Sequence, residues 1–253
     1  AHDIFVEDQL LARKLRSARM AVTISRYNVD YLAHWRGQDA APLEVVHCGV
    51  DLAELPLRLD GRDAQAIGTV GRLDPIKGFA VLIEALRRLR ERNTAFHCEL
   101  IGEGPLRAAL EAQRTTAGLE QALSMPGARP QEDVRAMLSR VAVFVMPSVT
   151  TPEGNQDGIP VALMEAMASG AAVVGTTVSG LPELIEHEVN GLLVPPNDAG
   201  ALAEAIARLL ADPALRRRLG EAARRSVERE FDAALEAGKL LQHIGDHLAR
   251  ERA

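Results

Sequence analysis

The sequence predicts an α/β fold in which a Rossmann-like parallel sheet has helices on both faces. Two observations support this prediction. From residue 60 onward, short apolar runs alternate with amphipathic helical patterns. The apolar runs are continuous, which indicates strands buried on both faces, as in a parallel sheet. In such a sheet ligands bind beyond the carboxyl ends of the strands.

The predicted strands are short runs rich in Val, Ile and Leu that end at glycine, proline or polar residues: residues 66–70, 96–101, 122–126, 141–146, 171–176 and 191–194. Apolar residues at helical spacing predict helices over residues 80–92, 106–115, 134–140, 160–169, 182–185, 199–210, 213–231 and 232–250. Pro160 suits the first position of its helix, where a missing N–H costs nothing, and Gly170 suits the end.

The first 60 residues show a different pattern. Helices are expected over residues 6–17 and 28–36, and strands over residues 20–24 and 43–47. Two strands and two helices make a poor core of their own. The expected division is a remnant of an N-terminal domain (residues 1–48), a linker (49–62), the main Rossmann-like domain (63–231) and a C-terminal helix (232–253).

Composition narrows the class of protein. A hydrophobic share of 47% is ample for a core, and the formal net charge of −6 argues against nucleic acid as a partner. Cys48 and Cys98 lack metal-ligand spacing and are expected to be reduced core residues. No apolar run approaches the ~20 residues of a membrane span. The expected location is the cytoplasm, and a peripheral association with the inner face of a membrane stays open.

Residues 152–170 carry the strongest functional signal. Asp157 lies in a glycine-containing loop, and Glu165 follows eight residues later on the predicted helix. A helix start attracts phosphate through its free N–H groups and partial positive charge. Glu165 lies ~7.5 Å further along the axis at ~1.5 Å per residue, roughly the span from a pyrophosphate to a ribose. The layout favours a sugar-nucleotide site; the alternative is that Asp157 only stabilises the helix dipole.

Other loops after strands carry weaker signals. Arg72 and Lys77 flank a turn and suit a diphosphate, although a solvated surface pair would look the same. Gly102 would let the backbone approach a ligand, but two glycines after a strand are more often a tight turn. Glu183 is either a first-turn acid of its own helix or a ligand. The run Glu186-His187-Glu188 does not predict a metal site, since consecutive side chains on a helix diverge.

Five segments follow one another along the chain: VVHCGVD, GRLDPIKGF, IGEGP, PSVTTPEGNQDGIPVALMEAMASG and VSGLPELIEHEVNGLLVPP. In these the chain resembles the retaining GT-B glycosyltransferases of family 4, in particular members that assemble polysaccharide or lipopolysaccharide. The resemblance covers nearly all of residues 40–230. It implies two Rossmann-like domains facing a cleft, of which the C-terminal one holds the nucleotide sugar and the N-terminal one the acceptor. Much of the N-terminal domain would be missing here, and the C-terminal helix would return toward it.

The resemblance also implies roles for single residues. Asp157 replaces the usual Glu that contacts the donor hexose, with Glu153 as an alternative in a different register. Glu165 would hold the ribose hydroxyls. The remaining assignments are Arg72 and Lys77 for the diphosphate, Gly158, Ile159 and Val161 for backbone contacts to the ligand, Arg129 near the base, and His2 approaching the donor.

The expected function is therefore transfer of a hexose from a UDP- or GDP-linked donor to a glycan or lipid-linked acceptor, with retention of configuration. No metal or other cofactor is expected, because two cations and a helix start can stabilise the leaving pyrophosphate. Three alternatives remain: a fragment that binds nucleotide sugar without turnover, a sugar-nucleotide epimerase of GT-B fold, and a glycosidase with paired carboxylates. The last is disfavoured because Asp157 and Glu165 lie beside a phosphate-type helix start.

Overall fold

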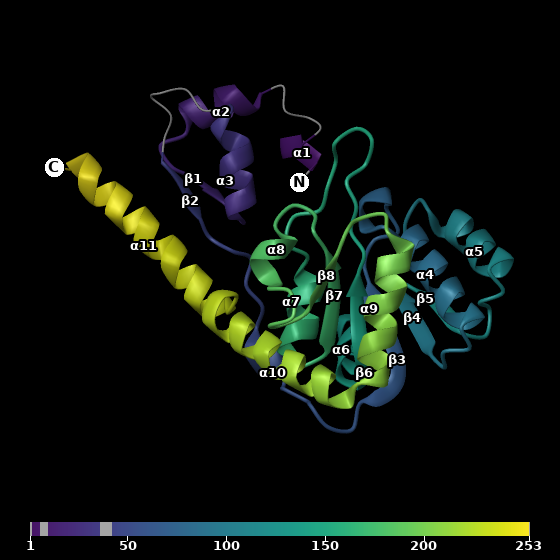
Figure 1. Ribbon diagram of the computed structural model, residues 1–253. Coiled ribbons are helices and arrows are strands. Elements are labelled where there is room, and N and C mark those ends of the chain that lie inside the picture. The colour runs from purple at the N-terminus through teal and green to yellow at the C-terminus, as the bar shows by residue number, and fades with distance from the viewer. Residues whose placement is uncertain (1, 6–9, 36–41, 253) are drawn as a thin grey trace.

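The computed structural model describes residues 2–5, 10–35 and 42–252 (Figure 1). Its centre is a six-stranded sheet in the order β5-β4-β3-β6-β7-β8, and every neighbouring pair is parallel. The strands are β3 (Asp63–Val70), β4 (His97–Ile101), β5 (Leu123–Gly127), β6 (Val141–Met146), β7 (Ala172–Thr176) and β8 (Leu192–Val194). The predicted α/β fold with a parallel sheet is thus confirmed.

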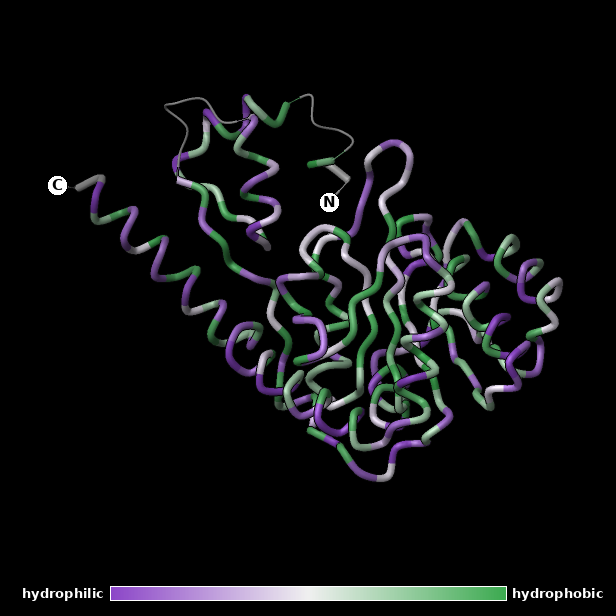
Figure 2. The backbone as a smooth tube through the Cα atoms, viewed as in Figure 1, coloured by the Kyte–Doolittle hydropathy of each residue, from purple (hydrophilic) through white to green (hydrophobic). Residues whose placement is uncertain are grey.

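Helices cover both faces of the sheet. One face is packed by α4 (Phe79–Glu91), α5 (Arg107–Thr116) and α9 (Ala199–Ala211). The other is packed by α6 (Gln131–Arg140), α7 (Val161–Ala168), α8 (Leu181–Leu184) and much of α10 (Pro213–Glu230). All six residues of β6 are buried, as a central strand with covered faces requires. Figure 2 shows the same arrangement, with hydrophobic strands in the middle and hydrophilic helix faces outside.

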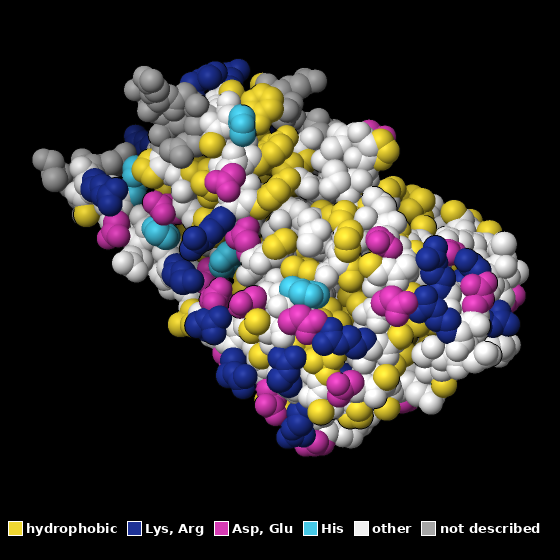
Figure 3. All heavy atoms as spheres, viewed as in Figure 1, with side chains coloured by type: hydrophobic (Ala, Val, Ile, Leu, Met, Phe, Trp, Pro, Cys, Tyr) yellow, Lys and Arg dark blue, Asp and Glu magenta, His cyan; other side chains and the backbone are white. Residues whose placement is uncertain are grey.

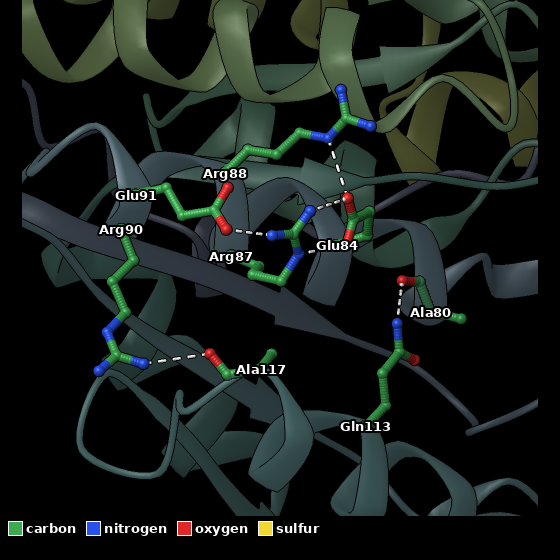
Figure 4. Close-up of polar contacts among 8 residues, drawn as sticks. All are labelled: Ala80, Glu84, Arg87, Arg88, Arg90, Glu91, Gln113 and Ala117. Atoms are coloured by element: carbon green, nitrogen blue, oxygen red, sulfur yellow. Dashed lines mark hydrogen bonds and ion pairs between the residues drawn. The ribbon is translucent and has the colours of Figure 1, made fainter.

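Polar contacts hold the outer helices together at the surface (Figure 4). On α4, Glu84 accepts hydrogen bonds from Arg87 and Arg88. These contacts, mainly the hydrogen bond from Arg87, lower the pKa of Glu84 to about 2. Gln113 Nε2 on α5 donates to the carbonyl of Ala80 over 2.9 Å and so joins α5 to α4. The ion pairs of Glu84 lie at the partly exposed surface and contribute modestly, since surface ion pairs are typically worth about 0–1 kcal/mol.

The N-terminal segment lies beside the loops that follow the strands (Figure 1). It contains α1 (His2–Phe5), α2 (Leu11–Ser17), β1 (Ala21–Thr23), α3 (Arg26–Ala33) and β2 (Leu43–Val45). The strands β1 and β2 form a separate parallel pair. The C-terminal helix α11 (Ala233–Arg252) runs back to this segment, where the buried Glu236 accepts a hydrogen bond from the His47 N–H over 2.7 Å.

Several details differ from expectation. The helix expected over residues 6–17 is seen as Leu11–Ser17, and residues 6–9 lie outside the described part of the chain. Cys98 is buried as expected and burial raises the pKa of its thiol, but Cys48 is exposed, so its placement in the core was wrong. Both thiols are free. Within the described residues, no helix combines the length and apolar character that crossing a membrane requires.

Candidate nucleotide-sugar site

Two loops meet at the carboxyl end of the sheet because their strands, β3 and β6, are neighbours. The first contains a 3₁₀ turn, Pro75–Lys77, capped by the Asp74 carboxylate, and ends at Gly78. Gly78 has φ 65°, and a Cβ there would lie 1.9 Å from the carbonyl oxygen of Pro147 in the second loop. The Val149 N–H also donates to the Ile76 carbonyl over 2.9 Å. Glycine at position 78 therefore permits the close contact that brings Lys77 to the second loop.

Lys77 and Asp157 form an ion pair at this junction. Lys77 Nζ lies 2.5 Å from Asp157 Oδ2, and both side chains are largely buried. Ser148 Oγ donates to the same carboxylate oxygen over 3.4 Å. Two of the residues selected from the sequence are thus brought together. Glu153, the alternative to Asp157, lies exposed in the same loop.

Arg72 occupies a different environment from Lys77. Its Nε lies 4.0 Å from Asp74 Oδ2, and its side chain is 74% exposed. The side chain is therefore free of the tight packing that fixes Lys77. A long exposed guanidinium can reach an incoming anion with little cost in broken contacts.

Glu165 lies further along α7 and lines a cavity of about 300 Å³. Gln131 Nε2, at the start of α6, donates to Glu165 Oε1 over 2.7 Å. Burial raises the pKa of Glu165, whereas the hydrogen bond from Gln131 and the charge of Arg135 oppose this rise. The cavity is also lined by Val161 and Asp51. Sequence reasoning missed Gln131 and Arg135; their only signal was a spacing of four residues on the helix after the Arg129 loop.

The start of α7, between Asp157 and Glu165, offers unpaired hydrogen-bond donors. Pro160 is the N-cap, so the helix begins one residue later than expected, and it carries no capping side chain. No hydrogen bond within the described ranges uses the backbone N–H groups of Val161 and Ala162. Free N–H groups at a helix start can bind an anion. Asp157 and Glu165 therefore flank a helix start that could receive phosphate.

The other residues selected from the sequence lie in several different environments. Gly102 packs against the Arg72 loop, because a Cβ at Gly102 would lie 1.9 Å from the Gly71 carbonyl oxygen; this favours the tight-turn alternative over a ligand contact. Arg129 is exposed in the loop before α6. Gly158 and Ile159 are buried, and Gly158 faces Ile24 of the N-terminal segment. The backbone of His2 belongs to α1, and its side chain lies outside the described residues.

Glu183 has a role that neither sequence-based interpretation included. Its two carboxylate oxygens accept hydrogen bonds from the backbone N–H groups of Arg26 and Tyr27, over 2.8 and 2.7 Å. Glu183 therefore caps α3, a helix that lies 156 residues away in the sequence, rather than acting only on its own helix. Among the described residues, no group of three or more His, Cys, Asp or Glu side chains could hold a metal ion.

Solved structures share this architecture. The chain superposes on sucrose-phosphate synthase from Thermosynechococcus elongatus with a TM-score of 0.84 at 29% identity, covering 96% of this chain and 62% of that one. It superposes on HepE from Anabaena, solved with UDP and glucose, with a TM-score of 0.82 at 21% identity, covering 97% and 69% of the two chains. The fold is thus that of the GT-B glycosyltransferases.

Sequence comparison identifies the family. The amylovoran biosynthesis glycosyltransferase AmsK of Erwinia amylovora is 40% identical over 217 residues, which are 84% of this chain and 53% of AmsK. The chain spans about half the length of the curated relatives it matches. The model of the family "Glycosyl transferases group 1" matches residues 61–226, and the chain belongs to this family. The membership in this glycosyltransferase family and the GT-B fold, both expected from the motifs, are thus confirmed.

Proposed function

We propose that this chain holds the donor in a glycosyltransferase that moves a hexose from a UDP- or GDP-linked donor to a glycan or lipid-linked acceptor, with retention of configuration. The observation that carries the proposal is the Lys77–Asp157 ion pair beside the start of α7. A diphosphate is a strong competitor for a lysine ammonium, whereas sugar hydroxyls can donate to a carboxylate. The ion pair is therefore the resting arrangement of two groups that would take different parts of one ligand.

Donor binding would exchange these partners. Lys77 would turn to the diphosphate, Arg72 would add a second cation, and the N–H groups of Val161 and Ala162 would donate to phosphate oxygens. Asp157, released from Lys77, would accept hydrogen bonds from the hexose. Glu165, oriented by Gln131, would accept from the ribose hydroxyls. Each group would then match one part of the nucleotide sugar.

In the transfer step, the acceptor oxygen bonds to the anomeric carbon while the bond from that carbon to the diphosphate breaks. The acceptor proton passes to a diphosphate oxygen, so no protein nucleophile is needed. Lys77, Arg72 and the helix start stabilise the negative charge that develops on the leaving group. We propose that this set of groups is sufficient without a metal ion.

The remaining parts of the proposal concern the whole protein. Residues 1–48 would belong to an acceptor-side domain, residues 49–62 to the linker and residues 63–231 to the donor domain, with residues 232–253 returning to the acceptor side. The Glu236–His47 contact supports that return path. The proposed location is the cytoplasm, with peripheral contact at the inner face of a membrane. Relatives named for polysaccharide biosynthesis, such as AmsK, support a glycan or lipid-linked acceptor.

Calorimetry separates the roles of the two carboxylates. UDP and UDP-glucose, and in parallel GDP and GDP-mannose, are titrated into the wild-type chain, Glu165→Ala and Asp157→Ala. Glu165→Ala should lose affinity for nucleotide and nucleotide sugar alike, because both carry the ribose. Asp157→Ala should lose affinity mainly for the nucleotide sugar. Unchanged nucleotide affinity in Glu165→Ala would refute the assignment of the ribose site.

A further inference from the structure

The loop that carries Asp157, residues 147–160, has no helix or strand of its own. A carboxylate on such a loop needs other contacts if it is to meet a sugar in one fixed place. Within the loop, Thr151 N–H donates to the Asn155 carbonyl, which closes a turn at the tip. Residue 156, next to Asp157, is a glutamine that is only 5% exposed. A buried amide must find hydrogen-bond partners.

Gln156 finds its closest partner in the N-terminal segment. Its Nε2 donates to the hydroxyl oxygen of Tyr27 over 2.7 Å, while the Thr150 hydroxyl donates to its Oε1 over 3.4 Å. Tyr27 belongs to the first turn of α3 and precedes Gln156 by 129 residues. The short hydrogen bond therefore ties the residue beside Asp157 to a different part of the molecule.

Tyr27 is itself held at its other end. Its backbone N–H donates to Glu183 Oε1, and the preceding N–H of Arg26 donates to Glu183 Oε2. Ser25 caps the same helix by accepting from the Asn28 N–H over 3.1 Å. The first turn of α3 is thus anchored to α8 on the main sheet. A Tyr27 hydroxyl placed on this anchored turn can serve as a fixed point for Gln156.

Close packing leaves little freedom around this connection. A Cβ at Gly158 would lie 2.8 Å from Ile24 Cδ1, and a Cβ at Gly180 would lie 2.8 Å from Ile159 Cγ1 and 3.1 Å from Ser25 Cβ. The loops after β6 and β7 therefore both meet the start of α3 directly. The Tyr27–Gln156 hydrogen bond lies in a packed interface rather than in an open gap.

We propose that Tyr27 is a positioning residue for Asp157. Through Gln156 it holds residues 147–160 against the N-terminal segment, so that this segment and the sugar-binding carboxylate keep one relative placement. The part of the inference that concerns the sugar depends on the proposed function; the part that concerns the loop does not. The consequence for the reaction is that the N-terminal segment, through Tyr27 and Gln156, determines where Asp157 holds the hexose.

Amide hydrogen exchange of residues 147–160 tests the anchoring without any ligand. Tyr27→Phe removes only the hydroxyl, and Gln156→Met removes its partner. Each should speed exchange in this loop by about three- to tenfold, the effect of losing one hydrogen bond. Gln113→Met is the matched control, because Gln113 makes a similar single hydrogen bond on the outer surface (Figure 4). It should leave exchange in the loop unchanged.

The double variant tests whether Tyr27 acts through Gln156. In the Gln156→Met background, Tyr27→Phe should have no additional effect on exchange in residues 147–160. Unchanged exchange in Tyr27→Phe would overturn the proposal. An undiminished effect of Tyr27→Phe in the double variant would also overturn it, since Tyr27 would then act by another route.

Ligand affinity tests the link to Asp157. Of UDP-glucose and GDP-mannose, the one that binds wild type more tightly is compared with its free nucleotide. Tyr27→Phe should lower the affinity for the nucleotide sugar by about three- to tenfold and change the affinity for the free nucleotide by less than about twofold. A loosened loop with unchanged sugar affinity would overturn the positioning of Asp157. If wild type binds neither UDP nor GDP, the proposed donor site fails, and the exchange experiment still decides whether Tyr27 anchors the loop.

Discussion

Lys77 Nζ and Asp157 Oδ2 lie 2.5 Å apart although their residues are separated by 80 positions in the sequence. They meet because β3 and β6 are adjacent and parallel, so the loops at their carboxyl ends emerge side by side. Gly78 allows the first loop to touch the second at Pro147. The sheet order, one glycine and one ion pair thus create the junction on which the proposed donor site depends.

The ion pair should contribute to stability. Asp157→Asn leaves the largely buried Lys77 ammonium facing a neutral partner, and we expect the free energy of unfolding to fall by about 1–3 kcal/mol. Asp60→Asn is the control. The Asp60 carboxylate pairs with Arg217, but its side chain is 86% exposed, so the free energy of unfolding should change by no more than about 0.5 kcal/mol. Urea unfolding of both variants measures this. Equal small losses would contradict a significant Lys77–Asp157 interaction.

Lys77 and Arg72 should recognise the second phosphate of the ligand. Lys77→Gln and Arg72→Gln should each lower the affinity for UDP by about tenfold or more, because a charge-assisted hydrogen bond is worth roughly 1.5–3 kcal/mol. Both variants should lower the affinity for UMP much less. Titration calorimetry with the two nucleotides gives the comparison. Equal losses for UDP and UMP would show that neither side chain contacts the diphosphate selectively.

The ionisation of Glu165 should give stability a characteristic pH dependence. Burial raises its pKa in the folded protein above 4.5, so the folded state binds this proton more tightly than the unfolded state. Ionisation then costs stability as pH rises from 4.5 through the raised pKa. Glu165→Gln lacks this cost, so its unfolding free energy relative to wild type should rise between pH 4 and pH 7.

Glu188 supplies a control of opposite sign. The hydrogen bond from Arg208 lowers the pKa of Glu188, so its contribution to stability is present above 4.5 and is lost as pH falls through the lowered pKa. Glu188→Gln should therefore become less stable relative to wild type as pH rises. Unfolding curves from pH 3 to pH 7 compare the two variants. Parallel slopes would contradict the raised pKa of Glu165.

Glycine at position 78 should be needed for the junction. Gly78→Ala places a Cβ 1.9 Å from the Pro147 carbonyl oxygen at φ 65° and should destabilise the protein by about 3 kcal/mol or more. Gly61→Ala has a similar φ of 72° but open space around the new Cβ, so only the backbone strain of about 1 kcal/mol applies. Thermal unfolding of the two variants measures the difference. Equal losses would mean that the contact with Pro147 is readily relaxed.

The sequence predicted the main sheet well because its signal is local. The run over residues 141–146 coincides with β6, and the helix expected over residues 80–92 is observed as Phe79–Glu91. Buried strands and amphipathic helices carry their pattern within a few neighbouring residues. The Asp157 and Lys77 loops could be selected for the same reason, since each directly follows such a strand. Cys48 shows the limit, because a cysteine alone does not reveal its burial.

The connections around the site could not be predicted in this way. Tyr27–Gln156 and Arg26–Glu183 join residues 129 and 157 positions apart, and Gln131–Glu165 joins two helices. Such contacts depend on how complete elements pack, and no periodicity in the sequence encodes them. The sequence predicts Glu183 either as an acid for its own helix or as a ligand, because it offers no sign that α3 lies next to this residue.

A crystal structure of the chain with a bound nucleotide sugar would test the central claim most directly. The ligand would be whichever of UDP-glucose and GDP-mannose binds more tightly. We predict that Lys77 has left Asp157 for the diphosphate, that the hexose donates to Asp157, and that the ribose hydroxyls donate to Glu165. A nucleotide sugar bound elsewhere, with the Lys77–Asp157 ion pair intact and Glu165 still hydrogen-bonded to Gln131, would contradict the proposed site.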